Sequence, residues 1–294
     1  MRSAVSGTRA GAGEVVLVTG GSSGIGRAIC DRLGRAGGRV YGGSRTPCAP
    51  ECWTYLRLDV TDDASVEAAV AEIVRREGRI DALVCCAGVS LAGPVEDTTV
   101  EEAQRHFDVN FFGSVRTIRA VLPIMRSRRR GRIVVIGSIG GLIGLPYLGY
   151  YSATKFALDG LIEAMRAEVA PFGIEAAVLH PGDFDTSLGQ RRTYSRATDA
   201  RSPYFATFER MRAFHAGMER QGRSPDAVAR KVERMLASRR LPVRALVGSP
   251  LEVLGVWGKA LLPSRSFEFL FCRAYGPRPW GRGQAARAEP DPQP

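Results

Sequence analysis

The chain has 294 residues, of which 45% are hydrophobic and 24% charged, proportions typical of a globular protein with one large domain or two small ones. Glycines interrupt its apolar stretches before they reach about 18 residues, which argues against a membrane-spanning helix. The formal net charge of +11 accompanies neither an aromatic stacking motif nor a recognition-helix pattern, so we expect a solvated basic face and no nucleic-acid partner; the alternative is attraction to anionic lipid or to a phosphorylated cofactor.

The N-terminal residues and the cysteines contain no targeting or metal-binding pattern. Residues 1–13 hold Arg2 and Arg9 among serine, glycine and alanine, without the apolar segment of a secretory signal, and predict a disordered tail. The six cysteines lack the spacing of a zinc site, so we expect no bound metal. Cys48 and Cys52 share a loop, but an intracellular chain would keep them reduced. The resulting expectation is a cytoplasmic protein.

The first predicted strand runs directly into a glycine-rich turn. Residues 14–19 form a short apolar strand, residues 20–26 read Gly-Gly-Ser-Ser-Gly-Ile-Gly, and a helix is predicted over residues 27–36. Glycines let the backbone approach a pyrophosphate, and the free N–H groups of a helix N-terminus bind the anion. A glycine-rich turn alone is a weak signal, but between a strand and a helix it predicts a dinucleotide site.

The end of the second predicted strand indicates which dinucleotide is bound. This strand covers residues 39–43 and is followed by Ser44 and Arg45. An NAD site usually places an acid here to bond the ribose 2′-hydroxyl, and this sequence has none. Because Arg45 can pair with a 2′-phosphate, the sequence favours NADP(H) over NAD(H); the alternative is an exposed loop arginine.

Strands and helices then alternate regularly along the chain. Further strands are predicted over residues 54–58, 82–85, 133–136, 175–179 and 244–248, with helices over residues 64–77, 101–126, 151–171 and 225–237. This order predicts an α/β fold, a doubly wound, Rossmann-like parallel sheet in a single domain over residues 14–250. Open sheets of this kind bind ligands at the carboxyl ends of their strands. Ser138 follows the central strand at such an end.

The helix after the central strand carries a tyrosine and a lysine that could act together in proton transfer. Tyr151 and Lys155 are four residues apart and therefore lie on the same helix face, whereas Tyr150 points elsewhere. A nearby ammonium favours the phenolate and lowers a tyrosine pKa that starts near ~10. That pair can exchange a proton near neutral pH. An isolated Tyr-x-x-x-Lys arises often by accident, so the interpretation depends on partners elsewhere in the chain.

The last third of the chain has a different composition. Residues 187–224 mix arginine with aromatic residues and predict helical segments that form a lid and substrate wall over the cofactor end of the sheet. Ser224 is the expected N-cap of the helix that follows. Residues 251–275 predict a C-terminal helical extension, either a packed helix pair or an element that contacts a membrane surface or a partner. Residues 276–294 are rich in proline, glycine and arginine and predict a disordered tail.

Together these motifs resemble the short-chain dehydrogenase/reductase family. The turn resembles its Thr-Gly-x-x-x-Gly-x-Gly motif, beginning at Thr19, and further motif residues match in order and spacing over roughly residues 14–250. The matching positions after the turn are Asp59, Asn110, Ser138, Tyr151, Lys155, Pro181, Gly182 and Thr186. Residues 137–161 are similar to the 17β-hydroxysteroid and retinol dehydrogenase branch.

The resemblance implies a role for each matching residue. Tyr151 would exchange the proton with the substrate oxygen, Lys155 would lower the pKa of Tyr151 and hold the nicotinamide ribose, Ser138 would bond the carbonyl or alcohol, and Asn110 would position a water linking Lys155 to solvent. The implied cofactor-binding residues are Gly20, Ser22, Ser23, Gly24, Ile25, Gly26, Arg45, Asp59, Val60, Ala87, Gly88, Tyr151, Lys155, Pro181, Gly182 and Thr186. Cys85 and Cys86 replace the usual Asn-Asn, which puts sheet rigidity and nicotinamide placement in question.

The implied function is an NADP(H)-dependent oxidoreductase that interconverts a ketone or aldehyde and an alcohol. The aromatic lid and the branch resemblance favour a bulky apolar substrate such as a steroid, retinoid, polyketide or lipid-like ketone. A nucleotide-sugar epimerase or dehydratase and a non-catalytic NADP-binding regulator are the alternatives. The resemblance also implies a homo-oligomer through the helices holding Asn110 and Tyr151. Peripheral membrane contact is a further expectation for the C-terminal extension.

Overall fold

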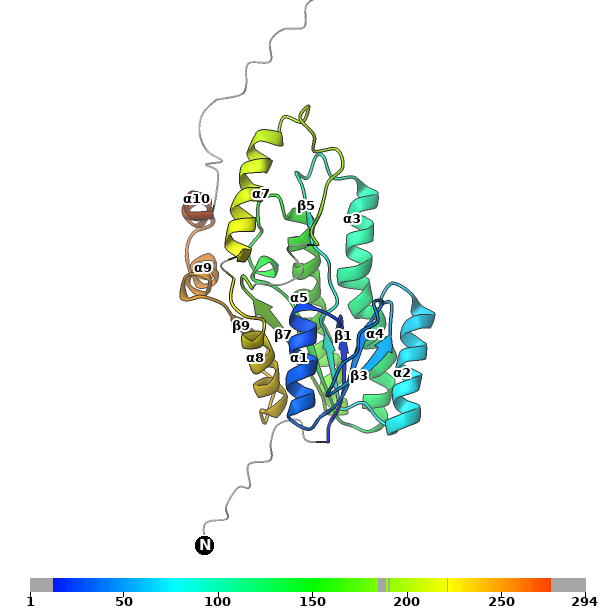
Figure 1. The fold of residues 1–294 in the computed structure, drawn as a ribbon. Coiled ribbons are helices and arrows are strands. Elements are labelled where there is room, and N and C mark those ends of the chain that lie inside the picture. The colour runs from blue at the N-terminus through cyan, green and yellow to red at the C-terminus, as the bar shows by residue number, and fades with distance from the viewer. Residues whose placement is uncertain (1–12, 185–188, 190, 221, 276–294) are drawn as a thin grey trace, which may run out of the picture.

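A seven-stranded parallel sheet forms the centre of the molecule (Figure 1). The computed structural model describes residues 13–184, 189, 191–220 and 222–275. The strand order is β3-β2-β1-β4-β6-β7-β9, and every pairing is parallel. The strands are β1 Val15–Thr19, β2 Arg39–Ser44, β3 Thr54–Arg57, β4 Ala82–Cys85, β6 Gly131–Ile136, β7 Ile174–Pro181 and β9 Arg244–Val247. The structure confirms the predicted doubly wound sheet.

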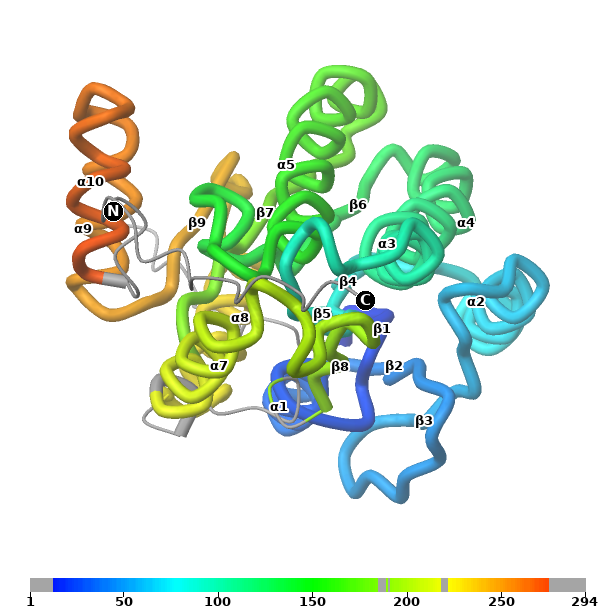
Figure 2. The backbone as a smooth tube through the Cα atoms, turned by 90° about the horizontal axis from the view of Figure 1, so that it is seen from above, coloured from blue at the N-terminus to red at the C-terminus, as the bar shows by residue number. Residues whose placement is uncertain are grey.

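Helices cover both faces of this sheet, as the view from above shows (Figure 2). One face is covered by α2 (Asp63–Glu77), α4 (Gly113–Ser127) and α5 (Gly149–Val169). The other is covered by α1 (Gly24–Arg35) and α8 (Asp226–Ala237). Because both faces are buried, the central strands are largely apolar, and all five residues of β1 and all four of β4 are buried. Two hydrophobic clusters, one on each side of the sheet, hold the layers together.

The predicted helix over residues 101–126 is interrupted, which corrects the sequence interpretation. The chain forms α3 (Val100–Phe107), a π-helical turn η1 (Asp108–Phe112) and then α4. A π-turn places one extra residue in the helix and often marks a functional position. It contains Asn110, whose buried side chain hydrogen-bonds the backbone of Val89 beyond β4. This long-range tether gives the turn a physical cause that no local pattern reveals.

A second, smaller layer lies above the carboxyl ends of the strands. Strand β5 (Leu91–Ala92) pairs with β8 (Thr193–Tyr194), and helix α7 (Phe205–Arg220) lies above the sheet, where the sequence predicted a lid (Figure 1). Short 3₁₀ turns, η2 (Ile139–Gly141) and η3 (Ala170–Phe172), follow β6 and α5. Thr186 and the two predicted tails, apart from Gly13, lie outside the described residues.

The C-terminal extension consists of two short helices beside the β9 edge of the sheet. They are α9 (Pro250–Leu261) and α10 (Ser264–Tyr275), and none of the residues of α9 is buried. Ser249 and Glu252 form a capping box at the start of α9. The N-cap of α8 is Pro225 rather than Ser224, although Ser224 Oγ still accepts a hydrogen bond from Asp226 N. Among the described residues, no helix is long and apolar enough to cross a bilayer.

Candidate active site

A cavity of about 920 Å³ extends along the carboxyl ends of the central strands. It gathers nearly all of the residues that the sequence singled out, although they come from seven separate segments. Those in its wall are Gly20, Ser22, Ser23, Gly24, Ile25, Gly26, Arg45, Asp59, Val60, Ala87, Gly88, Ser138, Tyr151, Lys155, Pro181 and Gly182. Asn110 is buried behind the wall, and Thr186 falls outside the described part of the chain. The roles assigned to these residues stay predictions.

The glycine-rich turn has the shape that a pyrophosphate requires. Gly20 and Gly24 adopt φ values of +75° and +53°, which side chains other than glycine rarely tolerate. A methyl group on Gly26 would overlap the carbonyl oxygen of Gly20, so helix α1 starts directly against the turn. No side chain caps this helix, because Ser23 makes no capping bond, and its first turn contains no acid. The uncapped N–H groups and the helix dipole therefore suit an anionic group in the cavity.

Thr19 holds the turn that follows β4. Its Oγ1 accepts hydrogen bonds from the backbone N–H of Cys86 at 3.0 Å and of Ala87 at 3.1 Å. Burial raises the pKa of the Cys86 thiol to about 12, so the side chain is neutral and packs as a small apolar group. The backbone beside the cavity is thus tethered to β1 without an amide side chain at position 86.

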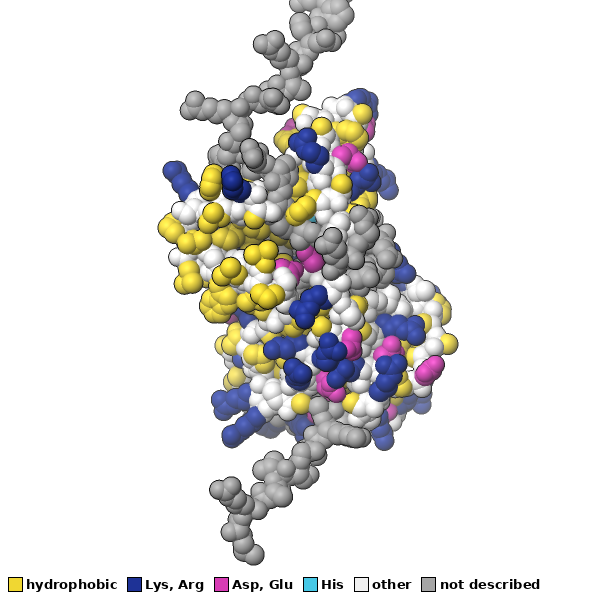
Figure 3. All heavy atoms as spheres, turned by 60° about the vertical axis from the view of Figure 1, so that its left-hand side comes forward, with side chains coloured by type: hydrophobic (Ala, Val, Ile, Leu, Met, Phe, Trp, Pro, Cys, Tyr) yellow, Lys and Arg dark blue, Asp and Glu magenta, His cyan; other side chains and the backbone are white. Residues whose placement is uncertain are grey.

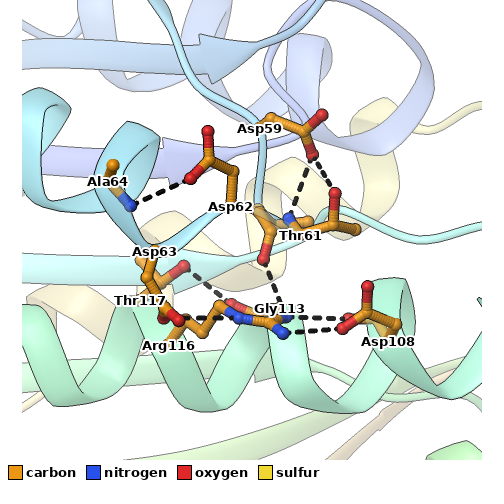
Figure 4. Close-up of polar contacts among 10 residues, drawn as sticks. Asp59, Thr61, Asp62, Asp63, Ala64, Asp108, Gly113, Arg116 and Thr117 are labelled. Atoms are coloured by element: carbon orange, nitrogen blue, oxygen red, sulfur yellow. Dashed lines mark hydrogen bonds and ion pairs between the residues drawn. The ribbon is translucent and has the colours of Figure 1, made fainter.

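The far end of the cavity is formed by the loops after β2 and β3. Arg45 is exposed and lines the wall close to Asp59. Burial opposes ionisation of Asp59, but hydrogen bonds from the backbone and hydroxyl of Thr61, with the charge of Arg45, outweigh it and lower the carboxyl pKa (Figure 4). Asp59 is therefore a carboxylate at neutral pH, and its accepting oxygens are directed by Thr61.

Arg116 links this loop to the π-turn, as Figure 4 shows. Its guanidinium donates to the carbonyl of Val60 at 3.2 Å and forms ion pairs with Asp63 at 3.4 Å and Asp108 at 2.7 Å. The loop that carries Asp59 is thereby fixed relative to the turn that carries Asn110. The sequence did not indicate Arg116, since its partners lie far apart in the chain.

Ser138, Tyr151 and Lys155 converge at the centre of the cavity. A methyl group on Gly140 would lie 3.4 Å from both Ser138 Oγ and Tyr151 Cε1, so the two side chains flank one point. Ser138 Oγ accepts a hydrogen bond from Gly140 N at 3.0 Å, which leaves its own proton for donation. Lys155 Nζ lies 5.8 Å from the centre of the Tyr151 ring. A hydroxyl donor, a phenol and an ammonium thus meet beside the cavity.

The side chain of Lys155 is almost completely excluded from solvent. Its side chain is buried, and Nζ donates to the carbonyl of Ile136 at 2.9 Å. Burial lowers the pKa of Lys155 to about 8, because the ammonium loses hydration that one carbonyl does not replace. The lysine is charged at neutral pH but close to its titration, and any anionic group that enters the cavity would favour the charged form.

Asn110 and His106 form a polar pair behind the tyrosine. Asn110 Oδ1 accepts from Val89 N at 2.8 Å, and Nδ2 donates to Val89 O at 3.0 Å, with His106 Nε2 at 3.1 Å. Burial lowers the pKa of His106 to about 4, so the ring is neutral, and its centre lies 6.1 Å from that of Tyr151. The sequence did not single out His106; its position one helical turn before Asn110 is the only available signal.

A second buried histidine supports Ser138 from below. His180 Nδ1 donates to the Ser138 carbonyl at 2.9 Å. Its Nε2 lies 3.2 Å from Asp159 Oδ1, an ion-pair distance although the two atoms are not aligned for a hydrogen bond. Arg244 Nε then donates to Asp159 at 2.8 Å. The network joins β7, α5 and β9 beneath the cavity, and it was not foreseen because the residues in contact are 21 to 85 positions apart.

The remaining walls of the cavity are largely apolar. Leu145 and Leu148 lie beside Tyr151, Phe214 comes from α7, and residues of α9 and α10 close one side. The apolar residues contributed by those two helices and the link between them are Leu251, Leu254, Leu262, Phe267, Leu270, Phe271 and Ala274. This half of the cavity would accept a hydrophobic molecule, whereas the half beside the glycine-rich turn suits an anion.

Known proteins share both this sequence and this architecture. A sequence-family model described as short chain dehydrogenase matches residues 14–197. The chain is 38% identical over 257 residues to a 3-ketodihydrosphingosine reductase of Bacteroides thetaiotaomicron, an alignment covering 87% of this chain and 96% of that protein. It is 39% identical over 194 residues to human 17-beta-hydroxysteroid dehydrogenase type 1, covering 60% of this chain and 58% of the human one.

A solved structure agrees with the sequence matches. A short-chain dehydrogenase from Streptomyces avermitilis superposes with a TM-score of 0.75 and 32% sequence identity, over 89% of this chain and 95% of that one. The two proteins therefore share the same fold over most of their length.

Proposed function

Since the chain belongs to the short-chain dehydrogenase family and is an oxidoreductase acting on alcohol and carbonyl groups, we propose that it reduces a bulky apolar ketone with NADPH. The observation that carries the proposal is the meeting of Ser138, Tyr151 and Lys155 at the border between the anion-binding and the apolar halves of one cavity. A carbonyl group of an apolar substrate would reach all three side chains there.

Each side chain has one task in the proposed reaction. NADPH, when bound, supplies the hydride. As negative charge develops on the substrate oxygen, the Ser138 hydroxyl donates a hydrogen bond to it and Tyr151 delivers a proton. The Lys155 ammonium stabilises the negative charge left on the tyrosine oxygen. Oxidation of the alcohol would reverse every step, with Tyr151 accepting the proton.

The proposed preference for NADP(H) depends on the loop after β2. Arg45 lines the cavity at the position where NAD sites usually carry an acid, and its guanidinium can pair with a 2′-phosphate. Thr19 and the uncapped helix α1 would hold the turn and the pyrophosphate, Asp59 and Val60 the adenine, and Lys155 the nicotinamide ribose.

The proposed substrate class depends on the apolar half of the cavity. Its leucine and phenylalanine side chains match a long hydrocarbon or a fused ring system better than a sugar or an acyl-phosphate. The Bacteroides relative, which the alignment covers almost entirely, is named for a long-chain ketone. We therefore favour a lipid-like ketone, such as a 3-keto sphingoid base, over a steroid.

Replacement of Tyr151 tests this function directly. Tyr151→Phe removes the proton donor but keeps the ring, so we expect kcat to fall by at least about 100-fold while the Kd for NADPH changes less than about twofold. NADPH absorbance with a panel of long-chain, steroid and short ketones would measure turnover, and fluorescence titration would measure binding.

The adjacent tyrosine is the matched control. Tyr150 lies in a separate surface pocket with Phe107 and Phe112, so Tyr150→Phe should leave both quantities unchanged. If Tyr151→Phe kept near-parental turnover on the best ketone, the assignment of Tyr151 would be wrong.

A further inference from the structure

The two C-terminal helices expose an unusual amount of apolar surface. Seven large apolar side chains of this segment are between 40% and 78% exposed: Leu251, Leu254, Trp257, Leu261, Leu262, Phe269 and Leu270. We call this set the C-terminal apolar face. In the space-filling view, hydrophobic side chains gather over this part of the molecule, with Lys and Arg side chains above and below them (Figure 3). Such a continuous patch generally marks an interaction site.

The orientation of α9 is fixed by polar contacts on its inner side. The Glu252 carboxylate accepts hydrogen bonds from Asp183 N at 2.6 Å and Ser249 N at 2.5 Å, beside Gly182 in the cavity wall. Farther along the helix, Lys259 Nζ lies 4.9 Å from the centre of the Phe156 ring of α5. The charged groups therefore face the protein while the leucines and Trp257 face outward, the reverse of an ordinary surface helix.

The C-terminal apolar face is continuous with the candidate active site. Leu251, Leu254, Leu262 and Leu270 belong to the exposed set and also line the cavity. Gly255 and Gly258 lie between them in the wall, where the absence of side chains leaves the backbone close to the cavity. An apolar molecule could thus pass from this surface into the cavity along these leucine side chains, which share the wall with the carboxylate of Glu252.

We propose that the C-terminal apolar face docks on the surface of an anionic lipid bilayer, and that the cavity receives its apolar ketone from the bilayer between α9 and α10. The net charge of +11 provides the attraction, and Arg265 and Arg273 lie on α10, one of the two docking helices. A protein partner bound to the C-terminal apolar face would instead cover the opening through which an apolar substrate enters the cavity. The docking stands on the exposed surface alone, whereas the delivery of substrate rests on the function proposed above.

Vesicle binding tests the docking without any assay of activity. We expect the full chain to float with vesicles of phosphatidylcholine and phosphatidylglycerol at a molar ratio of 3:1, and to float weakly with phosphatidylcholine alone. Trp257, Leu261 and Phe269 are exposed and do not line the cavity, so they can be replaced without altering it. The triple variant Trp257→Glu, Leu261→Glu, Phe269→Glu should bind the anionic vesicles at least tenfold more weakly.

Two further variants make the result specific. The triple glutamine variant at the same positions adds no charge and should also lose at least fivefold in binding, which guards against local unfolding by the acids. Val100→Glu with Val243→Glu alters exposed apolar residues elsewhere and should bind vesicles like the parent. All variants should retain the parental circular dichroism spectrum and affinity for NADPH.

Delivery of substrate is tested with two ketones, one embedded in vesicles and one dissolved in water. With the long-chain ketone embedded in anionic vesicles, the triple glutamate variant should lose at least tenfold in rate, whereas its rate on a short water-soluble ketone should equal that of the parent. Equal losses in both settings would overturn delivery through the bilayer.

The remaining outcomes separate the docking from the enzyme function. Failure of the parent to bind anionic vesicles, or parental binding by both triple variants, would overturn the docking. A parent that forms a dimer broken by these substitutions, without vesicle binding, would assign the face to a second copy of the chain and also overturn it. Vesicle binding by a protein that reduces no ketone would uphold the docking and count against the proposed function.

Discussion

Burial of Lys155 disfavours the charged form of its side chain. The ammonium is buried with one hydrogen bond to Ile136, and its pKa falls to about 8 from an ordinary value of 10.5. Below pH 8 the folded protein bears the cost of this buried charge. Between about pH 8 and 10.5 the unfolded chain binds one more proton at this site, so stability contributed by the site rises with pH in that window.

We therefore expect a pH-dependent difference between the parent and Lys155→Met. The free energy of unfolding of the parent should rise relative to that of the variant between pH 8 and 10, by an amount on the order of 3 kcal/mol if fully developed. Urea denaturation at the two pH values would measure it, and the variant corrects for every other titrating group. A difference that is independent of pH would contradict the low lysine pKa. For the same reason, kcat/KM for reduction should decline above about pH 8.

The residues that touch the cavity were the ones that the sequence revealed best. Gly20, Ser138, Tyr151 and Lys155 stand at spacings dictated by a turn or by one helix face, and such spacings are visible in one dimension. His106, Arg116 and His180 were missed because their partners come from other elements. Their function as supports depends on folding, which brings together positions that share no local pattern.

The elements around the site are joined by a buried network as well as by apolar packing. Asp159 on α5 contacts His180 of β7 and Arg244 of β9, and it is almost fully buried. Burial opposes its ionisation, but the close contact with the His180 ring and the hydrogen bond from Arg244 outweigh this and lower the pKa of Asp159. The stability that ionised Asp159 contributes is therefore present above about pH 4, and it is lost as the pH falls through the lowered pKa of this carboxyl.

Removal of this carboxylate should loosen all three elements. Asp159→Ala leaves the His180 ring and the Arg244 guanidinium without their common partner, and we expect the free energy of unfolding at pH 7 to fall by about 2–3 kcal/mol. Urea denaturation would measure the change. Glu163→Ala is the matched control, because Glu163 also pairs with Arg244 but its side chain is 61% exposed, and it should cost less than about 1 kcal/mol. Equal effects of the two substitutions would contradict the network.

The types and order of elements followed from the sequence, but their interruptions did not. The apolar strands and amphipathic helices produced the correct alternation, and the strand over residues 82–85 has the predicted bounds. The π-turn at Asn110 breaks a pattern that is helical on both sides, because its cause is the backbone of Val89 beyond another strand. For residues 251–275 the sequence left two possibilities, and the structure shows a helix pair with an exposed apolar face.

Across the whole molecule, the cavity connects loops from both halves of the sheet. A cofactor that occupied it would bind the folded state alone and would stabilise it by mass action. At a concentration of 100 Kd the gain is about 2.7 kcal/mol, which for a chain of this size corresponds to roughly 4–5 °C in Tm. A homo-oligomer formed through the helices that carry Asn110 and Tyr151 stays a prediction. Association of the subunits would raise Tm further.

We expect NADPH to raise Tm more than NADH at the same concentration. Arg45→Ser should remove this difference by lowering the affinity for NADPH without a comparable effect on NADH, since only NADPH has a 2′-phosphate. Differential scanning fluorimetry would measure it. Arg57→Ser is the control, because Arg57 is exposed near the same edge but does not line the cavity. A larger shift with NADH would contradict the NADP(H) preference.

The packing of α1 against α8 joins the two ends of the fold. Arg32 of α1 pairs with Glu233 of α8 at 2.5 Å, and Ile29 and Leu33 share an apolar cluster with Val228 and Val232. During synthesis, α1 leaves the ribosome roughly 200 residues before α8, a delay on the order of 10–40 s. Throughout that time the nascent chain exposes the parts of Ile29 and Leu33 that α8 will cover, so we expect the outer face of α1 to be accessible to chaperones until α8 has been synthesised.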